Sequence, residues 1–275
     1  MSILIWLVVA TLAMTVATVA LMRAPPRWMA VGVNLLLIAQ LVAVLRTGGG
    51  SPIALMKVFT VGVGANLFVL ARATALAERS WFRRLLVFTL AGNIAVLGAR
   101  EVVLDGMTMN AFAGIGLVLL LALPRTLRVS DDKQRRVTYQ VTIGWVLAYA
   151  VWDYNFLSML KDLDGTARVG SWGGLALVQV VATLLACRFR AEDFMVARVC
   201  SLVVLGIPIL VVPFEPWLMF TPGWRTPGLA QALYALALAL VLGAAVAAVL
   251  RARRGEAPQN GVEWAVAALT RRGDP

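Results

Sequence analysis

The chain has 275 residues, of which 61% are hydrophobic and only 14% are charged. A soluble domain carries about 25% charged residues, so this composition excludes an ordinary soluble protein. The net charge of +11 does not indicate nucleic-acid binding here, because Lys and Arg collect in the cytoplasmic loops of membrane proteins. With no His and only Cys187 and Cys200, the chain lacks the usual metal-ligand sets, so we expect no metal and no cofactor.

Nine aliphatic runs follow one another along the chain, and most approach the length of about 20 residues that crosses a bilayer. Short segments rich in Gly, Pro or Arg separate them. We therefore predict an all-α, polytopic transmembrane helix bundle with spans at 3–22, 28–46, 53–71, 85–104, 108–123, 137–157, 170–187, 193–212 and 228–250.

The spans are expected to form one transmembrane domain over residues 1–250, because no polar segment is long enough to fold separately. Residues 251–275 are then a basic cytoplasmic tail, in which Val262 to Leu269 could form a short interfacial helix. With the N-terminus outside, 18 of the 25 Lys and Arg residues lie on the cytoplasmic side and five lie on the outer side. This asymmetry favours an N-out, C-in orientation in the cytoplasmic membrane.

Charged side chains interrupt several spans, and the predicted topology brings them to a similar depth. Lys57 lies about one turn below the outer face, Arg100 and Glu101 end their span near that face, and Asp153 lies in the outer third of its span. A charge in hydrocarbon is costly, so such groups normally face a partner or water. We therefore predict an outward-facing polar cavity lined by Lys57, Arg100, Glu101 and Asp153.

The same depth criterion adds two amides and two aromatic side chains to the candidate binding residues: Asn93, Asn110, Tyr149 and Trp152. The alternative interpretation is that Lys57 and Arg100 extend to the membrane interface, while Arg100 and Asp153 form a structural ion pair. Arg198, in the inner part of span 193–212, has two interpretations of its own. Its side chain reaches the inner headgroups and binds anionic lipid, or it forms an inner gate.

Five motifs resemble, in order, those of a bacterial family of multipass membrane proteins of unknown function. The matching segments are Lys57-Val-Phe-Thr, Asn93-Ile with Arg100-Glu101, Asn110-Ala-Phe-Ala-Gly-Ile115, Ala148-Tyr-Ala-Val-Trp-Asp153 and Ala197-Arg198. The resemblance covers about residues 53–213 and implies a bacterial inner-membrane protein, but it implies no activity. Val96, Ala150 and Asp153 stand where the family has Glu, Asp and Asn, so any acidic site of the family is altered here.

The polar cavity favours a transporter or channel for an ion or small solute, in contact with the bilayer and with anionic headgroups on the cytoplasmic face. Two alternatives stay open. One is a membrane-embedded enzyme acting on a lipid-linked substrate, with Asp153 or Glu101 as acid or base and Lys57 or Arg100 holding a phosphate. The other is an accessory or structural subunit, and homo-oligomers are compatible with each of these functions.

Overall fold

The computed structural model describes residues 3–46, 52–158, 173–211 and 226–271. Within these ranges the chain forms ten α-helices and one two-stranded antiparallel sheet. The helices are α1 (Ile3–Arg23), α2 (Pro26–Arg46), α3 (Pro52–Ala73), α4 (Ser80–Arg100), α5 (Thr108–Leu119), α6 (Ile143–Ser158), α7 (Gly173–Ala186), α8 (Ala191–Val211), α9 (Pro227–Arg253) and α10 (Gly261–Arg271). The strands are β1 (Leu127–Val129) and β2 (Val137–Tyr139).

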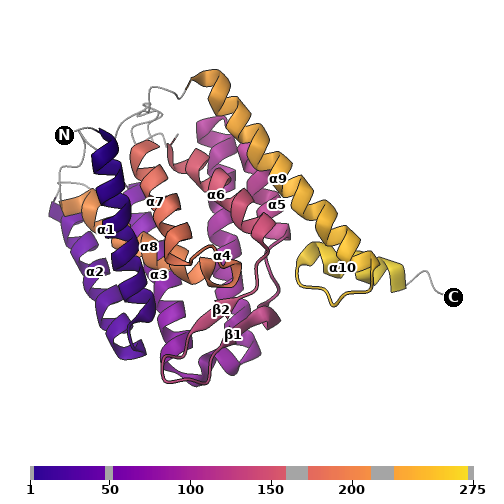
Figure 1. Ribbon diagram of the computed structural model, residues 1–275, viewed down its shortest axis with the longest axis horizontal. Coiled ribbons are helices and arrows are strands. Elements are labelled where there is room, and N and C mark those ends of the chain that lie inside the picture. The colour runs from indigo at the N-terminus through magenta and orange to yellow at the C-terminus, as the bar shows by residue number, and fades with distance from the viewer. Residues whose placement is uncertain (1–2, 47–51, 159–172, 212–225, 272–275) are drawn as a thin grey trace.

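Helices α1 to α9 lie side by side in a bundle, with α1 and α2 on one side and α9 on the other (Figure 1). Helix α1 packs against α7 and α8, α2 packs against α3 and α8, and α9 packs against α5 and α6. Helices that are distant in sequence are therefore neighbours, and α6 and α8 line the interior. The predicted architecture, a bundle of α-helices, is confirmed.

The outer surface of the bundle is apolar. Many large apolar side chains are exposed on it, among them Phe59, Phe88 and Phe112, which are 71%, 74% and 57% exposed. A protein in water rarely exposes so much apolar surface. Three helices, α1, Ser80–Val103 and α9, are long and apolar enough to cross a membrane. The shorter α5 and α7 are also apolar. These features indicate membrane association.

One predicted span is shorter than expected at its start. Residues 137–139 do not join α6, because they pair with β1 in the register Leu127 to Tyr139 and Val129 to Val137. The Tyr139 hydroxyl donates a hydrogen bond to the carbonyl of Ala122. Burial raises the pKa of Tyr139, so this hydroxyl stays protonated and remains a donor. Helix α6 therefore begins at Ile143 instead of 137.

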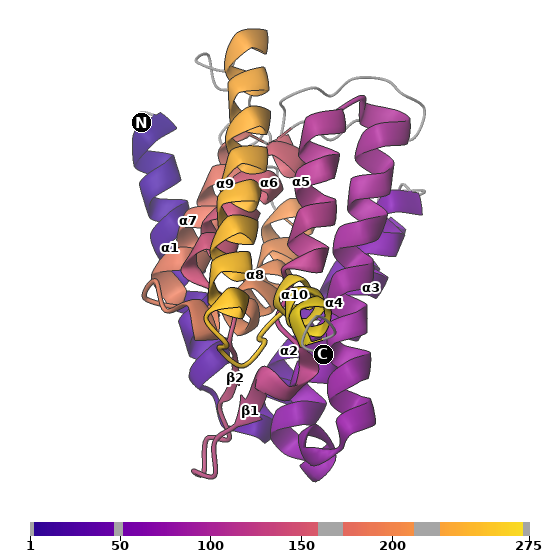
Figure 2. The same ribbon diagram turned by 90° about the vertical axis from the view of Figure 1, so that its right-hand side faces the viewer.

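The tail contains a helix, α10, where the sequence suggested one over 262–269. Figure 2 shows α9 upright and α10 nearly end-on, so α10 lies across the direction of the bundle. The buried Glu263 carboxylate fixes this arrangement by accepting hydrogen bonds from Arg251 at 2.6 Å and from the Asn260 amide at 3.1 Å.

Candidate functional site

Helix α6 carries polar and aromatic side chains on two of its faces. Tyr149 and Asp153 are four residues apart, so they lie one turn apart on the same face. That face meets Arg198 of α8. Trp152 lies on a neighbouring face and reaches Glu101, at the end of α4. All five side chains are almost completely buried.

Asp153 and Arg198 form a buried ion pair. The Arg198 Nη2 donates to the Asp153 Oδ1 at 2.8 Å. The Asp153 side chain is only 4% exposed and the Arg198 side chain only 5%. The Arg198 Nε donates to the Tyr149 hydroxyl at 3.3 Å. The Arg198 Nη1 is buried and has no hydrogen-bond partner within the described residues. Since a buried donor without a partner is costly, this nitrogen is available to a water molecule or a ligand.

A cavity of about 50 Å³ opens beside this pair. Four helices supply its walls, with polar groups from Thr60 of α3, Thr89 and Asn93 of α4, Tyr149 and Asp153 of α6, and Arg198 of α8. A cavity needs roughly 10–15 Å³ to hold one water molecule, so this one admits a few waters or a small ion but no larger solute. The Asn93 amide, which is half-buried, makes no hydrogen bond within the described residues and is also available to an occupant.

Glu101 belongs to a second polar cluster. It is the first residue of a π-helical turn, Glu101–Asp105, that continues α4. Its carboxylate accepts hydrogen bonds from the Asn110 amide and, at 3.1 Å, from the Trp152 indole. Asn110 in turn accepts a hydrogen bond from the Asn155 amide at 3.0 Å. These bonds hold the ends of α4, α5 and α6 together.

The two clusters meet at α6. The rings of Tyr149 and Trp152 are 5.5 Å apart between centroids, and Trp152 and Asp153 are neighbours in sequence. Glu101 and Trp152 do not line the cavity beside Asp153. Helix α4 also contributes to both clusters, through Asn93 at the cavity and Glu101 at its end.

The structure divides the predicted single cavity into separate groups. Asn93, Tyr149 and Asp153 come together at the cavity. The other predicted lining residues, Glu101, Asn110 and Trp152, form the second cluster. Arg100 is half-buried and does not line the cavity. Lys57 lies within α3, but its side chain is outside the described part of the structure.

Of the two interpretations of Arg198, contact with the inner headgroups is wrong, whereas a role in a gate stays a prediction. Its side chain does not extend to headgroups but is buried against Asp153, which therefore pairs with Arg198 instead of Arg100. Asp153 and Arg198 were expected at different depths because the predicted span begins at 137, whereas α6 begins at Ile143. Asp153 is ten residues after Ile143, and Arg198 is seven residues after Ala191, so the two lie at similar depth in helices that both begin at the hairpin end of the bundle (Figure 1).

Sequence reasoning also missed Asn155, Thr60 and Thr89. Asn155 is an amide inside an apolar helix, and that polarity was a usable signal. The two threonines carried no signal, since Thr commonly bonds to its own helix, as Thr89 does to the Leu85 carbonyl at 2.9 Å.

Comparisons with protein-family models, curated proteins and solved structures find no match to this chain. The resemblance to a bacterial membrane family stays a prediction that rests on the five motifs in the sequence.

Proposed function

We propose that this protein is a multipass membrane transporter or channel for a proton or small ion, and that the Asp153–Arg198 pair is its binding site. The observation that carries this proposal is the unused hydrogen-bonding capacity of a buried ion pair beside a polar cavity. A purely structural pair is expected to satisfy its polar groups internally. Here the Arg198 Nη1 has no partner within the described residues.

The nine-span, N-out and C-in arrangement is part of the proposal. It is supported by the placement of 18 of the 25 Lys and Arg residues on one side. It is also supported by the bundle of α1 to α9, in which the β1–β2 hairpin lies at the end opposite the N-terminus (Figure 1). In this arrangement the hairpin lies at the cytoplasmic face of the bacterial inner membrane.

The chemistry of the site limits its occupant. Asp153 and Arg198 together carry no net charge, so the cavity does not select strongly for cations or anions by charge alone. A proton transferred to the Asp153 carboxylate removes its attraction for Arg198 and leaves the guanidinium charge to be satisfied by water or an anion. Protonation and ion entry are therefore coupled through one pair, which a proton-linked transporter requires.

The test is flux into proteoliposomes that hold the purified full-length protein, with H⁺, Na⁺, K⁺ and Cl⁻ measured separately. Asp153→Asn is expected to abolish or strongly reduce the flux, because the amide cannot carry the charge that holds Arg198. Glu78→Gln changes a carboxylate to an amide at an exposed position and should leave the flux unchanged. Absence of flux for every ion would refute transport and favour an accessory subunit.

A second pair of variants tests the cavity itself. Gly64 lines the cavity and Gly92 does not, yet both are helical glycines at which an added Cβ atom would meet no neighbouring atom within 4 Å. Gly64→Leu is expected to fill the cavity and block flux, whereas Gly92→Leu should not. Equal flux in the two variants would show that ions do not pass through this cavity.

A further inference from the structure

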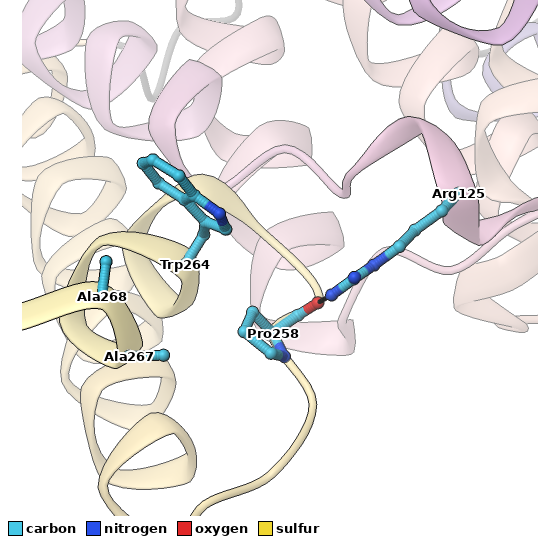
Figure 3. A pocket seen from close by; sticks show the side chains of 5 residues that line it. All are labelled: Arg125, Pro258, Trp264, Ala267 and Ala268. Carbon is cyan, nitrogen blue, oxygen red and sulfur yellow. Dashed lines mark hydrogen bonds between the residues drawn. The ribbon is translucent and has the colours of Figure 1, made fainter. Parts of the chain in front are cut away.

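A basic hollow lies at the start of α4, away from the Asp153 site. Its volume is about 290 Å³, and it is lined by Ser80, Arg83, Arg84, Leu123, Pro124, Arg125 and Trp264. A second hollow of about 190 Å³ shares Arg125 and Trp264 with the first and continues along α10. Figure 3 shows the second hollow, with the Arg125 side chain extended toward the Pro258 carbonyl and Trp264 projecting from α10.

The positive charge of this hollow is not neutralised by the protein. Arg83, Arg84 and Arg125 form no ion pair within the described residues, and the Arg83 Nε is buried without a hydrogen-bond partner there. The acidic residue of α10, Glu263, is only 2% exposed and is bound to Arg251. The three guanidinium groups therefore face the hollow with no competing carboxylate, which is the arrangement that binds a phosphate group.

The rim of the hollow is apolar. Leu123, Pro124 and Trp264 line the hollow itself, and Trp264 is 61% exposed. Elsewhere on α10, Leu269 is 71% exposed and Ala265 is also exposed. Trp81, in the first turn of α4, is 55% exposed. Indole side chains favour the boundary between headgroups and hydrocarbon, and α10 lies across the bundle as an interfacial helix does.

We infer that this hollow binds the headgroup of an anionic phospholipid. The lipid phosphate lies among Arg83, Arg84 and Arg125, and the acyl chains follow the apolar rim beside Trp264. A free phosphate ion would use the three arginines but would gain nothing from the rim, so the combination of charge and apolar surface specifies a lipid. The inference rests on the membrane location that the proposed function also needs, but it does not require transport.

The test is lipid binding to the full-length protein in a neutral detergent, measured by native mass spectrometry. The probes are phosphatidylglycerol, phosphatidylcholine and inorganic phosphate, each titrated separately. The wild-type protein is expected to retain one phosphatidylglycerol molecule at concentrations where phosphatidylcholine and inorganic phosphate do not bind. The triple variant R83Q/R84Q/R125Q is expected to bind phosphatidylglycerol at least about tenfold more weakly, since each cation near an anionic headgroup contributes to its attraction.

The control is R128Q/K133Q/R254Q, which removes the same charge from exposed positions that do not line the hollow. It should change the affinity by less than about twofold, because exposed charges that do not line the hollow are more strongly screened from a bound headgroup. Trp264→Ala is expected to weaken phosphatidylglycerol binding without creating phosphate binding. If the two triple variants lose equal affinity for phosphatidylglycerol, the lipid is attracted by the overall positive charge of the protein, and the inference is overturned. Tight binding of inorganic phosphate would also overturn it, because the hollow would then be a site for a free anion. Lipid binding by a protein that shows no ion flux would support this inference while refuting transport.

Discussion

Arg72 and Arg135 each donate a hydrogen bond to the backbone carbonyl of the other. The Nε of Arg72 is 3.2 Å from the Arg135 oxygen, and the Nε of Arg135 is 2.7 Å from the Arg72 oxygen. Arg72 is 1% exposed and also donates to the carbonyls of Met22, Ala24 and Gln134. One side chain thus joins the turn between α1 and α2, the end of α3 and the loop between β1 and β2.

We therefore expect Arg72→Ala to lower the free energy of unfolding by about 3 kcal/mol, because four partly buried carbonyls lose a donor at once. Arg72→Lys should recover little, since an ammonium group cannot reproduce the planar fork of donors. Thermal unfolding in detergent, followed by tryptophan fluorescence, measures the stability of both variants. Arg79→Ala, at an exposed position nearby, should stay within about 0.5 kcal/mol of wild type. Equal stability of the Arg72→Lys variant and the wild type would show that the several donors of the guanidinium group are not needed here.

The Asp153–Arg198 pair predicts that two substitutions together are milder than either alone. Asp153→Leu or Arg198→Met leaves one buried charge and should lower the free energy of unfolding by about 3–5 kcal/mol. The double variant D153L/R198M removes both charges, so most of that loss should be recovered. Denaturant unfolding of the four proteins gives the coupling energy. Simple addition of the two losses would mean that the groups do not interact.

Gly116 allows α5 to approach α9 closely. A Cβ atom at this position would overlap the Val241 side chain, so Gly116→Ala should destabilise the protein by about 1–3 kcal/mol. Adding Val241→Ala should restore much of the stability, because it removes the overlapping methyl groups. Gly92→Ala has open space and should be neutral or stabilising by up to about 1 kcal/mol. Thermal unfolding distinguishes these variants, and failure of Val241→Ala to rescue would refute the proposed overlap.

Because the Glu263 carboxylate joins α10 to the end of α9, we expect one substitution at Glu263 to release α10. The carboxylate accepts hydrogen bonds from two Arg251 nitrogens, at 2.9 and 2.6 Å, and from the Gln259 backbone amide at 2.6 Å. Glu263→Gln removes the ion pair, so hydrogen–deuterium exchange should accelerate over 261–271 and stay unchanged in α6. Glu256→Gln, at an exposed position, is the matched control. Unchanged exchange over 261–271 would show that other contacts hold α10.

Much of the helix order could be predicted from the amino-acid sequence. Every predicted span overlaps one helix, because a run of about 20 apolar residues in a chain with few charges has few structures in which its backbone is satisfied within lipid. The start of α6 could not be predicted, because Val137 and Tyr139 are as suitable for a helix in a membrane as for a strand. Only their pairing with β1 decides between the two.

The order of residues alone indicated that Asp153 faces a partner or water, since a charge in an apolar helix is costly, and it left Arg198 either at the headgroups or in a gate. It could not establish that they satisfy each other, because their pairing depends on where α6 begins and on which helices are neighbours. Packing also separated Glu101 from Asp153, although both were expected in one cavity. The reason is geometric: residues adjacent on a helix point in different directions, so Trp152 and Asp153 face different clusters.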